Sequence, residues 1–383
     1  DLTDGPHDEA RGIYASNDAS TERFVGSQKG QRTRAVVPYA ELHAHSHFSF
    51  LDGASSPEEL VLEAVRLDLS ALALTDHGGF YGVVRFAECA REVGLPTVFG
   101  AELTVDAWQA EETSTLRTQG SNFSRVGSVD PAGKRLIVLA RHPAGYASLS
   151  ALLSRSQMAG QKNAPRISTP ELFDALDSHR GDWALLTAGR RGAVPTALEA
   201  EGVLGARREL CQIVEAAGRE NVFVELWNHG DPSDDSRNDR LADLAAEQKV
   251  GLLCTNSVHY AVPSKRRLAK AMAAIRSRRS LDEINGWLPG HGSAHLRSGI
   301  EQQHWFSHYP GVVETAAELG QECAFDLALV APKLPPYPCP DDLDEMSYLR
   351  RVVYVGATSR YGARSAERVA GSWQQIAHEL GVI

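Results

Sequence analysis

The chain has 383 residues, of which 43% are hydrophobic and 23% charged, and its formal net charge is -10. This length predicts two or three folded units with ample core, and the acidic balance excludes a protein drawn to nucleic acid by its overall field. No apolar run approaches the ~20 residues of a membrane helix, and no signal peptide follows Asp1. The five cysteines form no CxxC pair, which indicates a reducing cytoplasm and no disulfide framework.

Short apolar runs alternate with helical patterns from Val36 to about Tyr260. Residues 1–36, by contrast, are polar and aperiodic and are predicted to be a flexible leader. The apolar runs are Ala71–Thr75, Thr97–Leu103, Leu136–Ala140, Trp183–Thr187, Val222–Leu226 and Gly251–Thr255. Strands separated by helices predict an α/β fold with a mainly parallel sheet, and six or more such units favour a closed barrel.

The alternation stops after Tyr260, and helical patterns follow. Helices are predicted over Ser264–Ser280 and Pro310–Cys323, with a capping box at Ser280–Glu283. Prolines then crowd residues 332–341, which predicts a stiff, extended linker. Two more helices are expected at about Asp342–Tyr361 and Ser365–Gly381. The predicted units are therefore a barrel at 37–263, a helical connector at 264–331, the linker at 332–341 and a helical segment at 342–383.

Histidines are concentrated in the segment Glu41–His47, which Asp52 follows. Residues two apart on a strand point the same way, so His43 and His45 can face one metal ion, and Asp52 can add an oxygen ligand. A polar strand end with hydrogen-bonded surface histidines is the plainer explanation of an HxH pattern taken alone.

Three further strand ends carry similar side chains. Asp76 and His77 follow one apolar run, Glu102 ends the next, and His259 comes after the last. Asp76 could instead cap the following helix. The carboxyl edge of a parallel sheet is where α/β enzymes place their sites, so four such strand ends favour one metal centre over four coincidences.

Taken in order, these motifs resemble the PHP domain at the front of bacterial C-family DNA polymerases. They read HAHS, LDGA, LTDHGG, FGAE and TNSVHY. Residues Tyr39–Glu102 are more similar to the error-prone branch, which acts in mutagenic repair and translesion replication, than to the replicative one. The resemblance extends through Leu136–Arg141, Ala294–Gly299 and Leu334–Pro336, and covers about Val36 to Ile383.

The resemblance implies a distorted seven-stranded βα barrel, the PHP fold, with a trinuclear metal site at the carboxyl ends of its strands. A mainly helical segment would then lead toward a polymerase palm. Family members with a complete site carry nine ligands and can act as metal-dependent 3′–5′ exonucleases. Six positions of this chain match that pattern: His43, His45, Asp52, His77, Glu102 and His259.

Three expected ligand positions depart from the pattern. Arg135 stands where a histidine is expected, Gly189 where a cysteine or histidine is expected, and Ser257 where an aspartate is expected. His142 is the one nearby residue that could compensate. A fixed cation at Arg135 repels a metal. The sequence therefore predicts partial or absent occupancy by a divalent ion such as Zn, Mn or Mg, and favours a structural PHP domain.

The sequence contains no candidate for the aspartate cluster of the polymerase palm, which in the family lies beyond the point matching Ile383. Residues 342–383 are thus expected to be the truncated start of palm-associated helices, and no catalytic residue is assigned. The resemblance implies that DNA and deoxynucleotides bind through the missing polymerase domains. It also implies partners among sliding clamps and accessory repair proteins, without a membrane.

A basic helix is predicted after the barrel, and it is either an amphipathic helix with a solvated face or a strip that contacts DNA phosphates. Its residues are Lys265, Arg266, Arg267, Lys270, Arg276, Arg278 and Arg279. Three functions stay open at this point: part of a polymerase with a structural PHP domain, a metal-dependent phosphoesterase or 3′–5′ exonuclease, and a non-catalytic interaction module.

Overall fold

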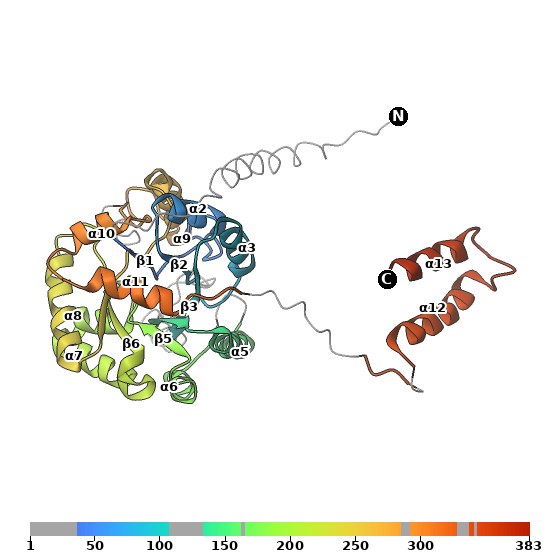
Figure 1. The fold of residues 1–383 in the computed structure, drawn as a ribbon, viewed down its shortest axis with the longest axis horizontal. Coiled ribbons are helices and arrows are strands. Elements are labelled where there is room, and N and C mark those ends of the chain that lie inside the picture. The colour runs from blue at the N-terminus through green and yellow to red at the C-terminus, as the bar shows by residue number, and fades with distance from the viewer. Residues whose placement is uncertain (1–36, 107–132, 162–164, 285–291, 328–336, 341–342) are drawn as a thin grey trace, which may run out of the picture. The chain divides into compact units, whose positions relative to one another are not determined.

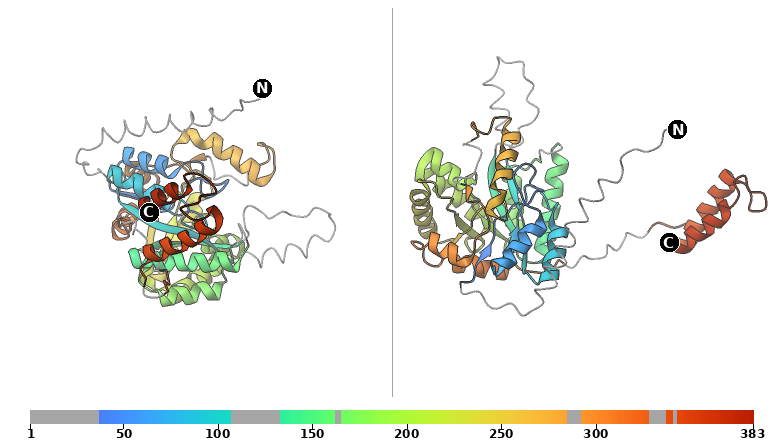
Figure 2. Two further views of the ribbon diagram at one scale, coloured as in Figure 1. Left: turned by 90° about the vertical axis from the view of Figure 1, so that its right-hand side faces the viewer. Right: turned by 90° about the horizontal axis from the view of Figure 1, so that it is seen from above.

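The computed structural model describes residues 37–106, 133–161, 165–284, 292–327, 337–340 and 343–383. The predicted leader and most of the predicted proline linker lie outside these residues. The chain divides into two compact units, Asp1–Leu327 and Ala328–Ile383. The first unit is a curled sheet with helices around it (Figures 1 and 2).

The sheet has seven strands, hydrogen-bonded in the order in which they occur in the chain. The strands are β1 (Ala40–Glu41), β2 (Ala71–Leu74), β3 (Thr97–Val105), β4 (Lys134–Ala140), β5 (Trp183–Leu186), β6 (Val222–Leu226) and β7 (Gly251–Cys254). All neighbours are parallel except β4, which runs antiparallel to both β3 and β5. The six apolar runs of the sequence are thus six of the strands, and the fold is the expected seven-stranded α/β barrel in a mixed form.

A single bridge brings the two edges of the sheet together. Ala44, just after β1, pairs in parallel with Val258, just after β7. The backbone N–H of Val258 donates to the carbonyl of His43 at 2.7 Å, and the backbone N–H of His45 donates to the carbonyl of Val258 at 2.8 Å. The barrel therefore closes through the segments that carry the histidines, which places the first and last motifs side by side.

Helices connect most of the strands, and clear capping signals begin two of them. Ser56 and Ser168 each form a full capping box, with Glu59 and Glu171 respectively, and a proline follows each cap. The connecting helices are α2 (Pro57–Arg66), α3 (Val83–Val93), α5 (Pro143–Ala159), α6 (Thr169–Ser178), α7 (Ala193–Ala217) and α8 (Asp234–Gln248).

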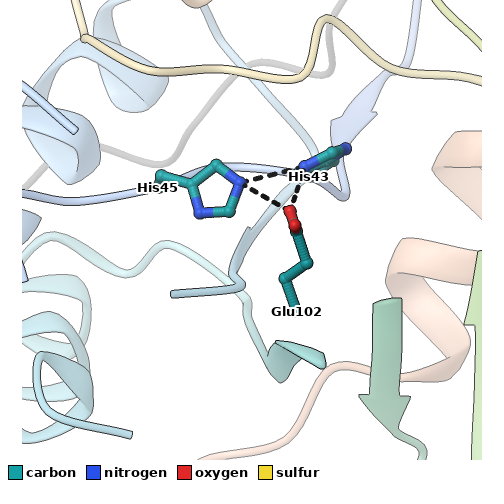
Figure 3. A group of neighbouring side chains, drawn as sticks. All are labelled: His43, His45 and Glu102. Atoms are coloured by element: carbon teal, nitrogen blue, oxygen red, sulfur yellow. Dashed lines mark hydrogen bonds and ion pairs between the residues drawn. The ribbon is translucent and has the colours of Figure 1, made fainter. Parts of the chain in front are cut away.

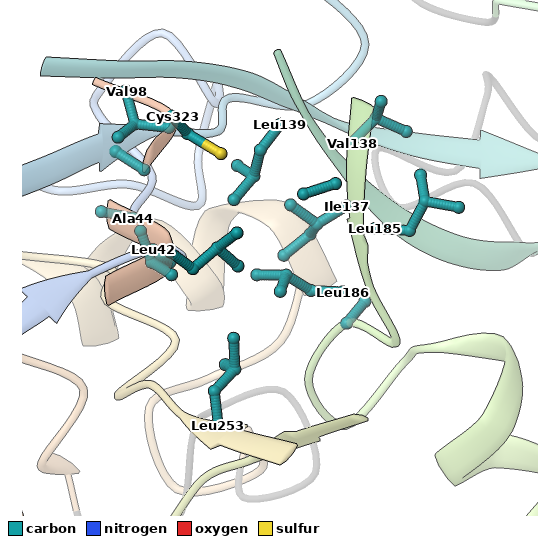
Figure 4. Packing of buried hydrophobic residues seen from close by; sticks show 14 of the residues in the cluster. Leu42, Ala44, Val98, Ile137, Val138, Leu139, Leu185, Leu186, Leu253 and Cys323 are labelled. Atoms are coloured by element: carbon teal, nitrogen blue, oxygen red, sulfur yellow. The ribbon is translucent and has the colours of Figure 1, made fainter. Parts of the chain in front are cut away.

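The core fills the space between the sheet and these helices. Leu42, Ile137 and Leu139 are fully buried there, beside the equally buried Cys323 (Figure 4). Cys323 follows α11 (Val312–Glu322), a helix from the region that the sequence assigns to a connector. The residues after Tyr260 therefore contribute to the same core as the strands.

Helix α11 packs closely against the amino ends of the first strands, opposite the edge that carries the histidines. Its Gly320 lies so near the sheet that a Cβ there would come 2.4 Å from the Cβ of Ala40. The backbone N–H of Phe325, just after α11, donates to the carbonyl of Thr97 at the start of β3. The helix thus covers one end of the barrel and leaves the other end for the site.

Four more α-helices lie in the described part of the chain. The basic segment forms α9 (Arg266–Ser277), and α10 (Gly299–Trp305) precedes α11. Residues Ser280–Glu283 form a turn rather than the capping box expected of them. The second unit contains α12 (Glu345–Tyr361), close to the predicted bounds, and α13 (Ser372–Val382), which begins seven residues after the predicted start at Ser365. No helix in the described part of the chain is long and apolar enough to span a bilayer.

The close packing of α11 generates a stability prediction. We expect Gly320→Ala to lower the free energy of unfolding by about 1–3 kcal/mol, because the added methyl overpacks against Ala40. Glu318→Ala is the control, since Glu318 is exposed on the same helix and its loss should change stability by about 0.5 kcal/mol or less. Urea unfolding measures both. Equal midpoints for the two variants would contradict the close approach.

Candidate metal centre

The six predicted ligands come from four segments at one end of the barrel. His43 and His45 lie just after β1, and His77 lies between β2 and α3. His77 forms an isolated bridge with Glu102, which sits within β3 rather than at its end. His259 follows β7. Strand β1 itself is only two residues long, so the closing bridge at Ala44, more than a continuous strand, turns both histidines inward.

Three of these side chains converge on one point. The Nε2 atoms of His43 and His45 are 3.0 Å apart, and they lie 3.4 and 3.1 Å from Oε2 of Glu102 (Figure 3). All three residues are buried. Donor atoms around a tetrahedral zinc ion, with bonds of ~2.0–2.1 Å, are about 3.3 Å apart. The trio therefore matches the spacing of ligands around a single ion.

The other three predicted ligands form an adjoining group. Oδ2 of Asp52 lies 2.8 Å from Nε2 of His77 and 3.5 Å from Nδ1 of His259. The ring of His45 stacks between them, with its centroid 4.4 Å from that of His77 and 5.2 Å from that of His259. The structure thus brings all six side chains into one continuous set of contacts.

Two buried carboxylates that the sequence analysis did not assign as ligands orient this set. Glu225 accepts a hydrogen bond from Nδ1 of His43 at 2.7 Å, which directs Nε2 of His43 toward the trio. Asp76 accepts from the backbone and hydroxyl of Ser46 and from the hydroxyl of Ser49, so it orders the loop after His45 and does not cap α3. In the sequence, Glu225 is the one charged residue of an otherwise apolar strand, and this pattern could have indicated a functional role.

The three departing positions lie in the same site. Nη1 of Arg135 donates to Oε1 of Glu102 at 2.7 Å. A Cβ at Gly189 would meet Oγ of Ser257 at 3.1 Å and Cε1 of His43 at 3.5 Å, so Gly189 lies beside both residues, and neither Gly189 nor Ser257 offers a strong ligand. The backbone of Ser257 has φ 43°, a strained value for a residue with a side chain.

His142 does not replace the missing ligand. Its Nδ1 accepts from the backbone N–H of Gly145 at the start of α5, and its Nε2 lies 3.3 Å from Asp182. It is absent from the residues that line the pocket around His43, His45 and Glu102.

Arg276 reaches the site from α9. Its Nη1 donates to Oδ1 of Asp52, the oxygen that does not face the histidines. Among the basic residues of this segment, Lys265 also has a carboxylate partner, Glu59 at 2.7 Å. Arg267, Arg278 and Arg279 are exposed. Of the other two proposed phosphate contacts, Arg266 is exposed and Lys270 is half-buried.

The basic side chains around Glu102 and Asp52 determine the charge state of both carboxyls. Burial alone raises the pKa of Glu102, but Arg135 and His77 outweigh it and hold that pKa well below its usual range. Burial likewise raises the pKa of Asp52, and His259, His77 and Arg276 lower it well below its usual range. Both groups are therefore ionised near neutral pH and available as metal ligands.

The histidines differ from one another. Burial lowers the pKa of His45 and of His259, so both rings are neutral near pH 7 and can offer a lone pair. Burial also lowers the pKa of His43, but Glu225 and Glu102 together raise it to about 10. An ion bound at Nε2 of His43 would have to displace a proton, which makes its affinity depend on pH.

The donor set fits one divalent ion better than a multinuclear cluster. In the described part of the chain, His43, His45 and Glu102 are the group of three whose donor atoms all lie within 4.8 Å of one another. Further ions would need the second oxygens of Glu102 and Asp52 as bridges, and those oxygens are bonded to Arg135 and Arg276. The residues present therefore fit a single ion at the trio.

Comparison with known proteins identifies the domain. Residues 41–229 match the family model described as "PHP domain". The chain contains a PHP domain. Over nearly its whole length it is also similar to proteins named error-prone DNA polymerase, as the motifs predicted.

Three of these relatives are as follows. The chain is 47% identical to the protein of Mycolicibacterium paratuberculosis over 99% of this chain and 32% of that protein. It is 50% identical to the protein of Mycobacterium tuberculosis H37Rv over 92% of this chain and 30% of that protein. It is 46% identical to the protein of Nocardia farcinica over 91% of this chain and 32% of that protein. The chain thus spans about a third of the length of these relatives.

Two solved structures resemble the PHP domain more distantly. One is a proposed metal-dependent phosphoesterase from Bifidobacterium adolescentis, with 16% identity, a TM-score of 0.37, and coverage of 59% of this chain and 89% of that chain. The other is an amidohydrolase from Chromobacterium violaceum, with 16% identity, a TM-score of 0.32, and coverage of 58% and 88%.

A buried histidine beside the PHP site generates a pH prediction. Nε2 of His229 donates to the carbonyl of Asn256 at 2.7 Å, and burial, with help from Arg297, lowers the pKa of His229 to about 4. The unfolded chain binds a proton there below about pH 6.5, and the folded chain does not until about pH 4. Stability should therefore fall as the pH drops through this window, by about 3 kcal/mol at most from this residue.

His229→Gln keeps an N–H donor but cannot titrate, so its free energy of unfolding should fall less steeply than that of the wild type between pH 6.5 and pH 4. His47→Gln, at an exposed histidine, is the control and should keep the wild-type slope. Urea unfolding across this pH range measures the slopes. Parallel curves for His229→Gln and the wild type would rule out the neutral buried ring.

Proposed function

We propose that this chain is part of an error-prone DNA polymerase, in which the PHP domain supports the polymerase and does not hydrolyse nucleic acid. The similarity to error-prone DNA polymerases over 99% of the chain carries this proposal. The polymerase activity itself, templated DNA synthesis during repair or translesion replication, is proposed for the whole protein, of which the chain spans about a third. Along this chain we propose the segments 1–36, 37–263, 264–331, 332–341 and 342–383, of which 37–263 and the first part of 264–331 share one core.

Hydrolysis of a phosphodiester would require more ions than this site can hold. Phosphodiester hydrolysis by a multi-metal site uses one ion to activate water and another to hold the leaving oxygen, with ions ~3.5–4 Å apart. A guanidinium and a divalent ion 4 Å apart repel by about 8 kcal/mol at an effective dielectric constant of 20. Arg135 and Arg276 both lie on carboxylates that would have to bind the further ions. A second ion is therefore strongly disfavoured.

We propose that one divalent ion, held by His43, His45 and Glu102, is the most this site binds. Two imidazoles and a carboxylate suit zinc best, with manganese and magnesium as weaker alternatives. Asp52, His77 and His259 would then be the remaining ligands of an incomplete set, paired with one another and without an ion of their own. Such an ion would link the segment after β1 to β3, which is a structural contribution.

The proposed partners follow from the proposed polymerase. DNA and deoxynucleotides would bind through the other two thirds of such a protein, and a sliding clamp and accessory repair proteins would bind there as well. The cytoplasm is the proposed location. Within this chain, the exposed arginines of the basic segment would provide at most a weak phosphate contact.

A second candidate function is a PHP phosphoesterase or 3′–5′ exonuclease. The observation in its favour is the trio itself, because its donor atoms have the spacing of a metal site. A single ion can polarise a phosphoryl oxygen, which allows slow turnover of a phosphate ester. Metal analysis combined with a nuclease assay separates the two candidates.

The metal prediction is tested on the 383-residue chain. We expect dialysis against Zn²⁺ or Mn²⁺ to leave no more than one ion per chain, and we expect no 3′–5′ digestion of a labelled primer above background. His45→Ala should abolish ion binding. His47→Ala is the control, because His47 is exposed and its ring packs against Phe48 instead. Two or more ions with robust digestion, lost in His45→Ala, would establish the phosphoesterase.

The polymerase prediction concerns the same chain with a primer-template. We expect no templated extension with Mg²⁺ and four nucleotides, and duplex binding at or weaker than the ~10⁻⁴–10⁻⁶ M typical of non-specific binders. The reasons are the net charge of -10 and the ion pairs of Lys265 and Arg276. Fluorescence anisotropy at two salt concentrations measures binding. Sub-micromolar affinity with a steep salt dependence, reduced by Arg267→Gln with Arg279→Gln, would instead assign a DNA contact to this segment.

A further inference from the structure

We propose that Arg135 and Arg276 are built-in counter-cations that take the place of further metal ions in the PHP site, and that Arg276 thereby fastens helix α9 to the barrel. The observation behind this proposal is that the carboxylates of Glu102 and Asp52 each divide their two oxygens between histidines and an arginine.

The same division occurs at both carboxylates. Oε2 of Glu102 faces the nitrogens of His43 and His45, while its Oε1 accepts from Arg135. Oδ2 of Asp52 faces His77 and His259, while its Oδ1 accepts from Arg276. A carboxylate bridges two ions by giving one oxygen to each. Here each carboxylate gives one oxygen to histidines and the other to a guanidinium.

Both guanidinium groups are enclosed with their partners. The side chains of Arg135 and Glu102 are 9% and 3% exposed, and those of Arg276 and Asp52 are 7% and 12% exposed. Burying a carboxylate without a cation is strongly unfavourable, so each of these groups needs a positive partner. The arginines provide that partner without any ion.

A third guanidinium supports this distribution of charge. Arg191 also lines the pocket, and burial together with the nearby Arg276 lowers its pKa, while Asp52 and Glu102 act in the opposite direction. Three arginines are thus close enough to two carboxylates for their charges to interact. A second or third divalent ion would enter a site where the cations are already present.

The two arginines come from different parts of the chain. Arg135 lies on β4, inside the barrel, whereas Arg276 lies near the end of α9, after the last strand. Helix α9 has a single buried residue, Ala273, and its half-buried Ala269 and Met272 pack on a small cluster with Tyr260. Its attachment by apolar contacts is therefore limited.

Ion pairs hold both ends of this helical segment. Lys265 pairs with Glu59 of α2 at one end, and Arg276 pairs with Asp52 at the other. The pair at Lys265 is partly exposed, and solvent weakens it. The enclosed pair at Arg276 is the stronger attachment. At Asp52, Arg276 thus occupies the oxygen that a further ion would use. The same ion pair joins the barrel to the helix that follows it.

The test uses the 383-residue chain and the variants Arg276→Met, Arg276→Lys and Arg267→Met. We expect Arg276→Met to bind Zn²⁺ or Mn²⁺ about tenfold more tightly, or to bind an additional ion, because the competing cation is gone. Arg276→Lys keeps the charge and should resemble the wild type. Arg267→Met is the matched control on the exposed face of α9 and should change nothing. Isothermal titration and metal analysis provide the readout.

The fastening of α9 is measured separately, by amide hydrogen exchange in EDTA. We expect exchange across α9 to accelerate about tenfold or more in Arg276→Met, and in Asp52→Asn with Arg276→Met, where no unpaired charge remains. In the single variant, added Zn²⁺ should restore thermal stability by neutralising Asp52. In the double variant it should not.

Unchanged metal affinity and unchanged α9 exchange in Arg276→Met would overturn the inference while leaving the proposed polymerase untouched. Arg276→Lys behaving like Arg276→Met would also overturn it, because shape rather than charge would then be the cause. Two or more ions in the wild type would contradict both the inference and the proposed single-ion site. The three results are distinguishable from one another.

Discussion

Both carboxylate oxygens of Glu102 have polar partners, and the geometry of the site depends on these two sets of contacts. One oxygen faces two histidines from the segment after β1, and the other accepts from Arg135 on the neighbouring strand β4. Because β4 runs antiparallel to β3, the two residues lie on adjacent strands near the same end of the barrel. The mixed topology thus determines which cation the carboxylate meets.

Closure of the barrel determines the rest of the site. The bridge between Ala44 and Val258 joins the first and last segments of the sheet, so His45 comes within stacking distance of His259. Glu225 then fixes the orientation of the His43 ring by accepting a hydrogen bond from Nδ1 of that histidine. The site is therefore assembled by long-range backbone pairing, which is why residues distant in the chain can be so closely packed.

The sequence predicted the parts of the molecule that follow from periodicity and from local signals. Six apolar runs became strands, and the predicted helix after Tyr260 formed as α9, because both features depend on near neighbours in the chain. Glu225 was not assigned because its role depends on a ring 182 residues away. Arg276 was interpreted as part of a basic surface, since helical spacing alone does not tell which arginine turns inward. The packing of α11 on the sheet was missed for the same reason.

The departures from the ligand pattern are not equivalent, and the physical chemistry of burial explains the difference. Gly189 and Ser257 are small neutral residues, and they remove donors without leaving any charge unbalanced. Glu102 and Asp52 remain, and an enclosed carboxylate needs a cation whether or not an ion binds. Arg135 lies at a departing position and supplies that cation to Glu102, while Arg276 supplies it to Asp52 from a helix outside the ligand pattern. A site that loses donors but keeps its acids is stable only if arginine or an ion neutralises them, and here guanidinium groups do so at both carboxylates.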